Sequence, residues 1–544
     1  MRPPAIRRWD RETALVAALA SAASLAVFLV CFQRGEILLY GDAVAHISIA
    51  RRVFDSQTPG LLQLGTVWLP LPHLLMIPFL LWDAMWQNGL GGSIPSLVAF
   101  VLGVVGVFRL VRGVLSVQRG PDKTNRLAAW IAAVIYAANP NLLYLQATAM
   151  TEALYLALFI WVIVHFAEFV QTDPGQSTRR SLLKCGLCLG GACLTRYDGW
   201  FLAVIVGFAV LVIMLRREGL AQLLRPGFRG FVLFAAIAPI FWLTYNAIVY
   251  KNPLEFANGP YSAKAIERKT SVPGTPPHPG ASDLPVAATF FLKSAELNLV
   301  QSNWHRLWLA LALLGTATVL LFDRRLWPLL LLWVPLPFYM LSIAYSGVPL
   351  FLPPWWPHSY YNVRYGVQLL PFFAVFVALV AFWALEFFRG ARARTVTLAA
   401  TALLVAVSYT VNWRQTPISF QEAWINSRTR IALETELARN LSRLPANSTI
   451  LMYLGDHGGA LQRAGIPLRR VIYEGNHRSW KQPIDPEGLW ERTLAAPEKY
   501  ADFVVAMNGD AVARGVSRGK LSPLSVIHVQ GQPEATVFRV LRQP

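Results

Sequence analysis

Long apolar runs separated by short basic clusters dominate the chain up to about residue 412. A helix needs about 20 apolar residues to cross the hydrocarbon core of a membrane, and by that measure the pattern predicts about eleven spanning helices. The first run, Thr13 to Phe32, is too long for the apolar core of a signal peptide, so we expect an uncleaved first span. The other spans are expected at about 93–113, 127–145, 148–170, 182–195, 199–215, 230–250, 304–322, 326–345, 365–388 and 395–412.

The basic clusters predict the orientation of these spans. Cytoplasmic loops of membrane proteins carry an excess of Lys and Arg. Five basic loops fall on the same side as the arginine-rich N-terminus: 109–126, 179–184, 216–229, 324–325 and 389–394. We therefore expect a cytoplasmic N-terminus and an exoplasmic segment from Trp413 onward.

Two long loops are expected on the exoplasmic side, at about 34–92 and 251–302. The first contains a proline-punctuated apolar stretch from Trp68, which predicts short helices rather than one straight span. The second contains the Pro- and Gly-rich stretch 271–280, which is typical of a turn-rich loop.

The segment from Trp413 to Pro544 has a different pattern. Short runs rich in β-branched and aromatic residues predict strands, and a helical pattern over 421–444 precedes them. The strands are expected at 449–454, 470–473, 503–507, 524–529 and 536–541. We therefore divide the chain into a membrane domain, 1–412, and a small extracytoplasmic α/β domain, 413–544.

Composition agrees with a membrane protein and argues against a nucleic-acid-binding one. The chain is 55% hydrophobic and 15% charged, whereas soluble domains carry about 25% charged residues. The net charge of +19 comes from the loop clusters and forms no basic face interleaved with aromatic residues.

The first exoplasmic loop holds the most informative motif, Gly41-Asp42-x-x-x-His46. If a helix starts here, Asp42 and His46 lie one turn apart on the same face. Asp42 is then either a helix cap or a carboxylate at the water–lipid boundary that can take a proton from a hydroxyl. The alternative that Asp42 and His46 both ligate a divalent metal ion also stays open, although two ligands without a third make a weak site.

Three further charged residues stand at the exoplasmic ends of spans: Glu152, Arg196 and Arg364. Ionisable residues in or near a span are candidates for function, and arginine suits the phosphate of an amphiphile whose tail stays in the bilayer. The alternatives are that the arginines anchor the spans at the interface and that Glu152 forms a structural salt bridge with one of them.

At these residues the chain resembles the C-type membrane glycosyltransferases, the group containing protein O-mannosyltransferases and lipid A aminoarabinose transferases. The resemblance rests on Asp42 and His46 in the first loop, on Thr151-Glu152-Ala153, and on Arg364-Tyr365 followed by Pro371. It covers residues 1 to about 412. Protein O-mannosyltransferases have Asp-Glu where this chain has Asp42-Ala43, so their acceptor specificity is not carried over.

The resemblance implies a polytopic α-helical fold and an inverting transfer of a sugar from a polyprenyl-phosphate donor to an acceptor hydroxyl. Asp42 would be the catalytic base. Arg364, Tyr365, Arg196, His46 and Glu152 would bind the donor phosphate or sugar. No cofactor is expected. The active site would face the periplasm of a bacterial inner membrane, and the acceptor is a lipid, a glycan or a protein.

Two other functions compete with this interpretation. A secondary transporter would predict broken helices near the midplane and internal symmetry, and the sequence has neither. A glycan polymerase or ligase that uses a lipid-diphosphate donor is the second; the first-loop aspartate and the exoplasmic segment favour the transferase over it.

Overall fold

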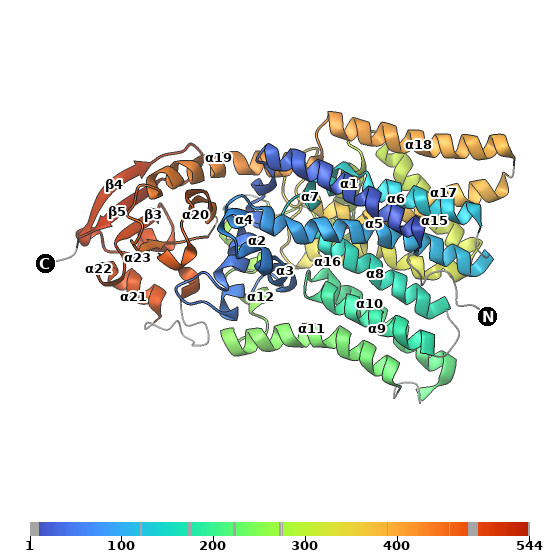
Figure 1. The fold of residues 1–544 in the computed structure, drawn as a ribbon, viewed down its shortest axis with the longest axis horizontal. Coiled ribbons are helices and arrows are strands. Elements are labelled where there is room, and N and C mark those ends of the chain that lie inside the picture. The colour runs from blue at the N-terminus through green and yellow to red at the C-terminus, as the bar shows by residue number, and fades with distance from the viewer. Residues whose placement is uncertain are drawn as a thin grey trace.

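The computed structural model describes residues 10–119, 122–171, 176–220, 225–270, 274, 276–388, 390–455, 457–476 and 488–541. It consists of a long helical body with a smaller sheet-containing domain at one end, and short helices lie between the two (Figure 1). Part of the Pro- and Gly-rich stretch of the second loop, residues 271–273 and 275, lies outside the described residues.

The helices of the body run mostly along its long axis. They are α1 (Arg11–Gln33), α5 (Leu90–Arg119), α6 (Lys123–Ala137), α7 (Pro140–Gln146), α8 (Glu152–Gln171), α9 (Gln176–Cys193), α10 (Asp198–Glu218), α11 (Pro226–Tyr250), α14 (Leu284–Leu299), α15 (His305–Leu321), η5 (Arg324–Trp333), α16 (Pro335–Tyr345), η6 (Val363–Leu369), α17 (Leu370–Phe387) and α18 (Ala391–Arg414).

Each of the eleven predicted spans coincides with one or two of these helices, and the polytopic helical fold is confirmed. Among the described residues, eight helices are long and apolar enough to cross a membrane, or nine if α6 and α7 count as one bent span. The count is lower than eleven for two reasons: α15 has 17 residues, and α9 carries Arg179, Arg180 and Lys184. The 63° bend between α6 and α7 falls at Pro140, which cannot continue the hydrogen-bond ladder.

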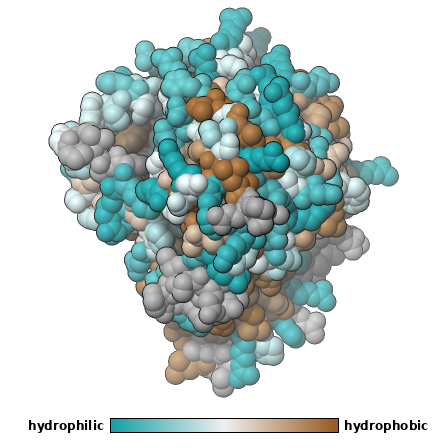
Figure 2. Space-filling view, turned by 90° about the vertical axis from the view of Figure 1, so that its left-hand side faces the viewer, coloured by the Kyte–Doolittle hydropathy of each residue, from teal (hydrophilic) through white to brown (hydrophobic). Residues whose placement is uncertain are grey.

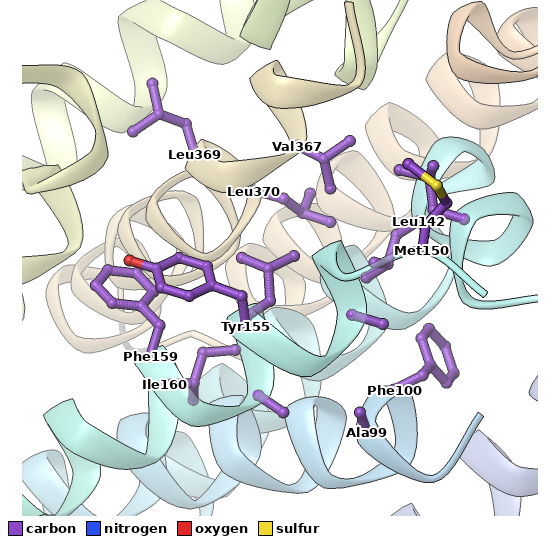
Figure 3. Packing of buried hydrophobic residues seen from close by; sticks show 14 of the residues in the cluster. Ala99, Phe100, Leu142, Met150, Tyr155, Phe159, Ile160, Val367, Leu369 and Leu370 are labelled. Carbon is purple, nitrogen blue, oxygen red and sulfur yellow. The ribbon is translucent and has the colours of Figure 1, made fainter. Parts of the chain in front are cut away.

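Helices α8 and α17 form the centre of the body. Their apolar segments are 78% and 83% buried, against 28% for α1 and 22% for α11. In Figure 3, Phe100 of α5, Tyr155 and Ile160 of α8, and Leu370 of α17 converge in one buried cluster. The apolar surfaces that α1 and α11 leave exposed are those expected to face lipid.

The first predicted loop forms short helices, as expected. These are η2 (Glu36–Leu38), α2 (Gly41–Arg52), η3 (Leu61–Leu64), α3 (Leu71–Leu80) and α4 (Asp83–Gln87).

The second loop is more structured than its sequence indicated. Besides α12 (Glu255–Asn258) and α13 (Ala263–Thr270) it contains α14, and Ser294 and Asn298 of α14 both donate to the carbonyl oxygen of Val363, at 2.7 Å each.

The C-terminal domain contains all five predicted strands. They are β1 (Ile450–Met452), β2 (Val471–Ile472), β3 (Phe503–Met507), β4 (Leu521–Ile527) and β5 (Ala535–Val540), in the order β2-β1-β3-β5-β4. Strand β1 pairs in parallel with β2 and β3, whereas β5 pairs antiparallel with β3 and β4. The helices of this part are α19 (Ile418–Leu441), α20 (Gly459–Ala464), η7 (Leu468–Arg470), η8 (Glu474–Asn476), α21 (Leu489–Ala495), α22 (Pro497–Tyr500), α23 (Ala511–Gly515) and η9 (Arg518–Lys520).

The domain is docked firmly onto the body. One hydrophobic cluster continues from the body helices into the sheet, through residues such as Leu433 of α19 and Met452 of β1. Seen from the C-terminal domain, most of the face is hydrophilic, and hydrophobic side chains show near its centre, on its right side and at its lower edge (Figure 2). The division at residue 412 stays a prediction, because α19 packs against both η6 of the body and α20 of the domain.

Candidate active site

Asp42 stands at the start of α2, where the first loop meets the helical body. Arg430 of α19 holds the segment before Asp42 in place, because its Nη2 donates to the carbonyl oxygens of Leu38 and Leu39 at 3.1 and 2.9 Å. The N-cap of α2 is Tyr40, so Asp42 is not the capping residue. Its carboxylate, 41% exposed, accepts instead from Arg364.

Arg364 lies at the centre of the site, in η6, and contacts three carboxylates. Its Nη2 lies 2.6 Å from Asp42 Oδ2, its Nε 3.2 Å from Glu152 Oε1, and its Nη1 3.0 Å from Glu422 Oε1. The arginine side chain is 8% exposed, and Glu152 and Glu422 are buried. Asp42 is therefore the partner of Arg364 that solvent or a ligand can reach.

Arg196 forms a second cationic centre next to the first. Its Nη1 lies 3.4 Å from Glu152 Oε1, so Glu152 bridges both arginines. Its Nε lies 3.2 Å from Asp198 and its Nη2 donates to the Tyr339 hydroxyl at 2.9 Å. The Tyr339 hydroxyl in turn donates to Asp198 at 3.1 Å, which closes a ring of polar contacts.

Tyr365 joins the two arginines through its ring. The guanidinium carbons of Arg196 and Arg364 each lie 5.1 Å from its centroid. The face of an aromatic ring attracts cations, and more so where water is excluded. The ring therefore holds two like charges side by side.

The side chain of His46 contacts a second histidine and not the arginine that pairs with Asp42. Its Nδ1 lies 2.8 Å from Nε2 of His73 in α3, and its ring lies 4.6 Å from that of Trp68. Burial lowers the pKa of His46 to about 4, with the arginines lowering it further and Asp42 opposing them. The pair is thus neutral near pH 7, with one ring donating and the other accepting.

Carboxyl groups outnumber arginines among the described residues of this site. Four carboxylates, those of Asp42, Glu152, Asp198 and Glu422, meet the guanidiniums of Arg196 and Arg364. One oxygen of Glu152, Oε2, is buried and has no hydrogen-bond partner. The nitrogens of both arginines are thus already hydrogen-bonded, and an anionic ligand that binds them has to take the place of one of these partners.

The described part of the chain has no group of three His, Cys, Asp or Glu residues placed to hold a metal ion. The expectation that no cofactor is needed stays a prediction.

The structure brings together the predicted residues Asp42, Glu152, Arg196, Arg364 and Tyr365, and places His46 one turn along α2. Their chemical roles stay predictions. Sequence analysis missed Glu422, Asp198 and Tyr339. Asp198 could have been predicted from its place two residues after Arg196. Glu422 could not, because the sequence assigned its helix to the C-terminal domain.

An apolar pocket of about 410 Å³ lies between α10 on one side and η5 and α16 on the other. Ile205 of α10 lines one wall, and residues of η5 and α16 such as Trp333 and Leu336 line the other. The same two elements carry partners of Arg196, because α10 begins at Asp198 and α16 contains Tyr339. Ile205 is seven residues beyond Asp198, or about 10 Å along a helix.

No family model matches the chain, and no curated protein matches its sequence. Solved structures do. The crystal structure of ArnT from Cupriavidus metallidurans bound to undecaprenyl phosphate has a TM-score of 0.59 at 14% identity, covering 97% of this chain and 99% of that one. The apo state of the same protein gives 0.57 at 14%, covering 97% and 98%. Archaeal oligosaccharyltransferase AglB from Archaeoglobus fulgidus, in complex with an inhibitory peptide and a dolichol-phosphate, gives 0.47 at 13%, covering 91% and 69%.

The likeness to ArnT extends over nearly the whole of both chains and shows that they share a fold. The fold expected from the resemblance to C-type membrane glycosyltransferases is therefore confirmed.

Proposed function

We propose that this protein is a membrane glycosyltransferase that moves a sugar from a polyprenyl-phosphate donor to a hydroxyl of an acceptor, with inversion at the anomeric carbon. The observation that carries the proposal is the contact between Asp42 and Arg364. A candidate base and a candidate phosphate-binding group meet at 2.6 Å, at the exposed edge of an otherwise buried charge cluster. The shared fold with ArnT bound to undecaprenyl phosphate supports a donor of this chemical class.

The donor phosphate would bind Arg364 and Arg196. Because arginine forms paired hydrogen bonds with phosphate oxygens, two adjacent guanidiniums suit a phosphodiester. The polyprenyl tail would occupy the apolar pocket between α10 and α16, two elements that also carry contacts of Arg196.

Donor binding would also prepare the base. Without a ligand, Asp42 occupies Nη2 of Arg364. A phosphate oxygen that takes over this nitrogen releases the Asp42 carboxylate toward the open side of the site, where it can accept a proton from the acceptor hydroxyl. The buried partners Glu152 and Glu422 stay in place and keep Arg364 oriented.

In the reaction, the acceptor oxygen forms a bond to the anomeric carbon on the face opposite the phosphate while its proton passes to Asp42. The bond between the anomeric carbon and the phosphate oxygen breaks, and the electron pair leaves with polyprenyl phosphate. The two arginines stabilise the charge that develops on this leaving group.

The site would face away from the cytoplasm. The N-terminal end of the body, opposite the C-terminal domain in Figure 1, holds basic residues such as Arg112 and Arg126, as the positive-inside rule requires of the cytoplasmic side.

The experiment is an assay of purified protein with a panel of undecaprenyl-phosphate sugars in the presence of a chelator. Released sugar is quantified, and the anomeric configuration of donor and product is compared by NMR. Turnover with inversion supports the proposal. Retention of configuration, or no turnover of any donor by folded protein, contradicts it and favours a lipid-diphosphate donor or transport.

A further inference from the structure

Two carbonyl groups lie at the junction between η2 and α2, just before Asp42. They belong to Leu38 and Leu39, whereas the hydrogen-bond ladder of α2 begins one residue later, at the carbonyl of Tyr40. Backbone carbonyl groups outside such a ladder need a donor from elsewhere when protein surrounds them. Arg430 of α19 is that donor: its Nη2 lies 3.1 Å from the oxygen of Leu38 and 2.9 Å from that of Leu39.

The guanidinium of Arg430 is itself held from its other side. Its Nη1 lies 2.7 Å from Oε1 of Glu434, one turn further along α19, and neither side chain is more than 9% exposed. Oε2 of Glu434 lies 3.4 Å from Nε of Arg463 in α20. Gly459, where α20 begins, packs against the same carboxylate, because a Cβ at this position would lie only 2.4 Å from Glu434 Oε2. The C-terminal domain therefore fixes Glu434, and through it Arg430.

The same helix also holds the arginine that pairs with Asp42. Glu422 lies 3.0 Å from Nη1 of Arg364, and Arg430 follows Glu422 by eight residues, or about 12 Å along α19. One helix thus acts on both partners of the 2.6 Å contact between Asp42 and Arg364. It contacts the arginine directly and the aspartate through the backbone that precedes it. The position of α19 therefore sets the separation between the candidate base and Arg364.

Stability alone does not account for the buried pair of Arg430 and Glu434. Burial of an ion pair costs desolvation, so apolar residues of similar volume often stabilise a core equally well. An arginine adds a planar set of donors with fixed directions, which a lysine lacks. Misplacement of a catalytic group by about 1 Å can lower a rate by about a hundredfold. The pair is therefore best explained by the position that it gives to the chain before Asp42.

We propose that Arg430 is a positioning residue of the transfer reaction: it holds the backbone before Asp42 so that this carboxylate stands where it takes the proton of the acceptor hydroxyl. Arg430 acts through this backbone and does not contact the acceptor. The inference rests on the proposed function and extends it to the C-terminal domain, whose Glu434 and Gly459 keep Arg430 in place.

The test compares wild type with Arg430→Gln, Arg430→Lys and a control, Arg439→Gln, each as full-length protein in detergent. Arg439 lies on the same helix with its side chain 64% exposed. Three quantities are measured on the same samples: turnover at saturating donor, the dissociation constant of undecaprenyl phosphate, and backbone hydrogen exchange of residues 36–46. In Arg430→Gln the buried carboxylate of Glu434 keeps Arg463 as a cationic partner, so we expect the variant to fold.

We expect Arg430→Gln to lower turnover at least tenfold and to speed exchange in residues 36–46. Undecaprenyl phosphate should bind it no more than threefold more weakly than wild type, because Arg364 is intact. Arg430→Lys keeps the charge but not the set of fixed donors, so its turnover should lie between that of wild type and that of Arg430→Gln. Arg439→Gln should match wild type. A loss of donor affinity as large as the loss of turnover would overturn the inference.

A double variant separates positioning from general damage. If Arg430 acts through Asp42, adding Arg430→Gln to Asp42→Asn should lower turnover less than twofold beyond Asp42→Asn alone, because the base is already absent. Two losses that multiply would overturn the inference, since they would show that Arg430 acts independently of Asp42.

Gly459→Ala tests the same contacts from the C-terminal domain. Its added Cβ displaces the carboxylate of Glu434, and turnover should fall severalfold. The control is Gly515→Ala, whose Cβ would make an ordinary contact of 3.5 Å with Leu494 in the same domain. Equal turnover by the two glycine variants would overturn the role given to this domain. Arg430→Lys and Gly459→Ala serve as the test if Arg430→Gln does not fold.

Failure of the proposed function and failure of this inference give different results. Absence of turnover in wild type would remove the proposed function. Turnover in wild type that Arg430→Gln and Arg430→Lys leave unchanged would remove this inference alone.

Discussion

Glu422 holds Arg364 from two directions. One carboxylate oxygen accepts from the backbone N–H of Arg364 at 3.1 Å, and the other lies 3.0 Å from its Nη1. The Tyr40 hydroxyl, two residues before Asp42, also donates to Glu422, at 3.2 Å. Through this one buried side chain, α19 fixes both the arginine and the approach to the candidate base.

Replacing Glu422 by Gln should therefore impair the site without unfolding the protein. The amide keeps the size of the side chain but removes the charge that orients Arg364, so we expect donor turnover to fall at least tenfold. Glu436→Gln is the matched control, because Glu436 lies on the same helix with its side chain 45% exposed. Equal turnover by the two variants would mean that Glu422 does not position Arg364.

The ring of Tyr365 is predicted to matter more than its hydroxyl. Two guanidiniums lie against it, and a desolvated cation–π contact contributes about 2 kcal/mol or less. Tyr365→Leu should weaken binding of undecaprenyl phosphate by about tenfold, whereas Tyr365→Phe should bind like wild type. A direct binding titration distinguishes them, and a loss in Tyr365→Phe as large as that in Tyr365→Leu would argue against the stacking role.

The docking of the C-terminal domain should depend on Asp55. This buried carboxylate lies 2.8 Å from Arg51 Nε and accepts from the backbone N–H groups of Leu468 and Arg469 at 3.2 and 3.1 Å. Asp55→Ala removes one of the two acidic partners of Arg51 and leaves these two backbone N–H groups without their acceptor. Each buried donor left unsatisfied costs about 1–3 kcal/mol.

Thermal unfolding in detergent measures the effect on stability, and limited proteolysis measures release of the domain. The control is Asp83→Ala, which removes the other acidic partner of Arg51, a side chain that is 62% exposed. A control as unstable as Asp55→Ala would show that the damage does not come from the domain contact.

Acid should destabilise the protein through His46. Burial lowers its pKa from 6.5 to about 4. Below pH 6.5 the unfolded chain therefore takes up a proton that the folded protein excludes until about pH 4. The free energy of unfolding therefore keeps its full value above pH 6.5. It falls progressively between pH 6.5 and pH 4, by up to about 3 kcal/mol. In His46→Gln, the apparent melting temperature should fall less between pH 7 and pH 4.5 than in wild type, and an equal fall would contradict this assignment.

The sequence predicted the parts of this molecule that depend on local patterns. Apolar runs located the spans, and short runs rich in β-branched and aromatic residues located all five strands. The sequence placed Asp42, Glu152, Arg196 and Arg364 on one side of the membrane, and the structure brings them into contact. The Asp42–His46 spacing left a metal site as a weak alternative; His46 contacts His73, which comes from another helix and was not singled out in the sequence.

What escaped prediction depends on contacts between distant segments. Glu422 follows Arg364 by 58 residues, in a helix whose pattern indicated only the start of a separate domain. Helix α14 lies in the segment predicted to be a loop. Its polar residues Ser294 and Asn298 both donate to the Val363 carbonyl, and Asn298 also accepts from the Ser419 hydroxyl. Buried polar residues of this kind are hydrogen-bonded to partners far away in the sequence, and the periodicity of apolar residues does not identify those partners.

The most direct test of the central claim is a comparison of wild type with Asp42→Asn, using a donor that wild type turns over. Donor binding and sugar transfer are measured separately, with chelator present. The account predicts that Asp42→Asn binds the donor at least as well as wild type, because Arg364 loses a competing charge, and that transfer falls by at least a hundredfold. Transfer by Asp42→Asn at the rate of wild type would remove Asp42 as the base and contradict the mechanism.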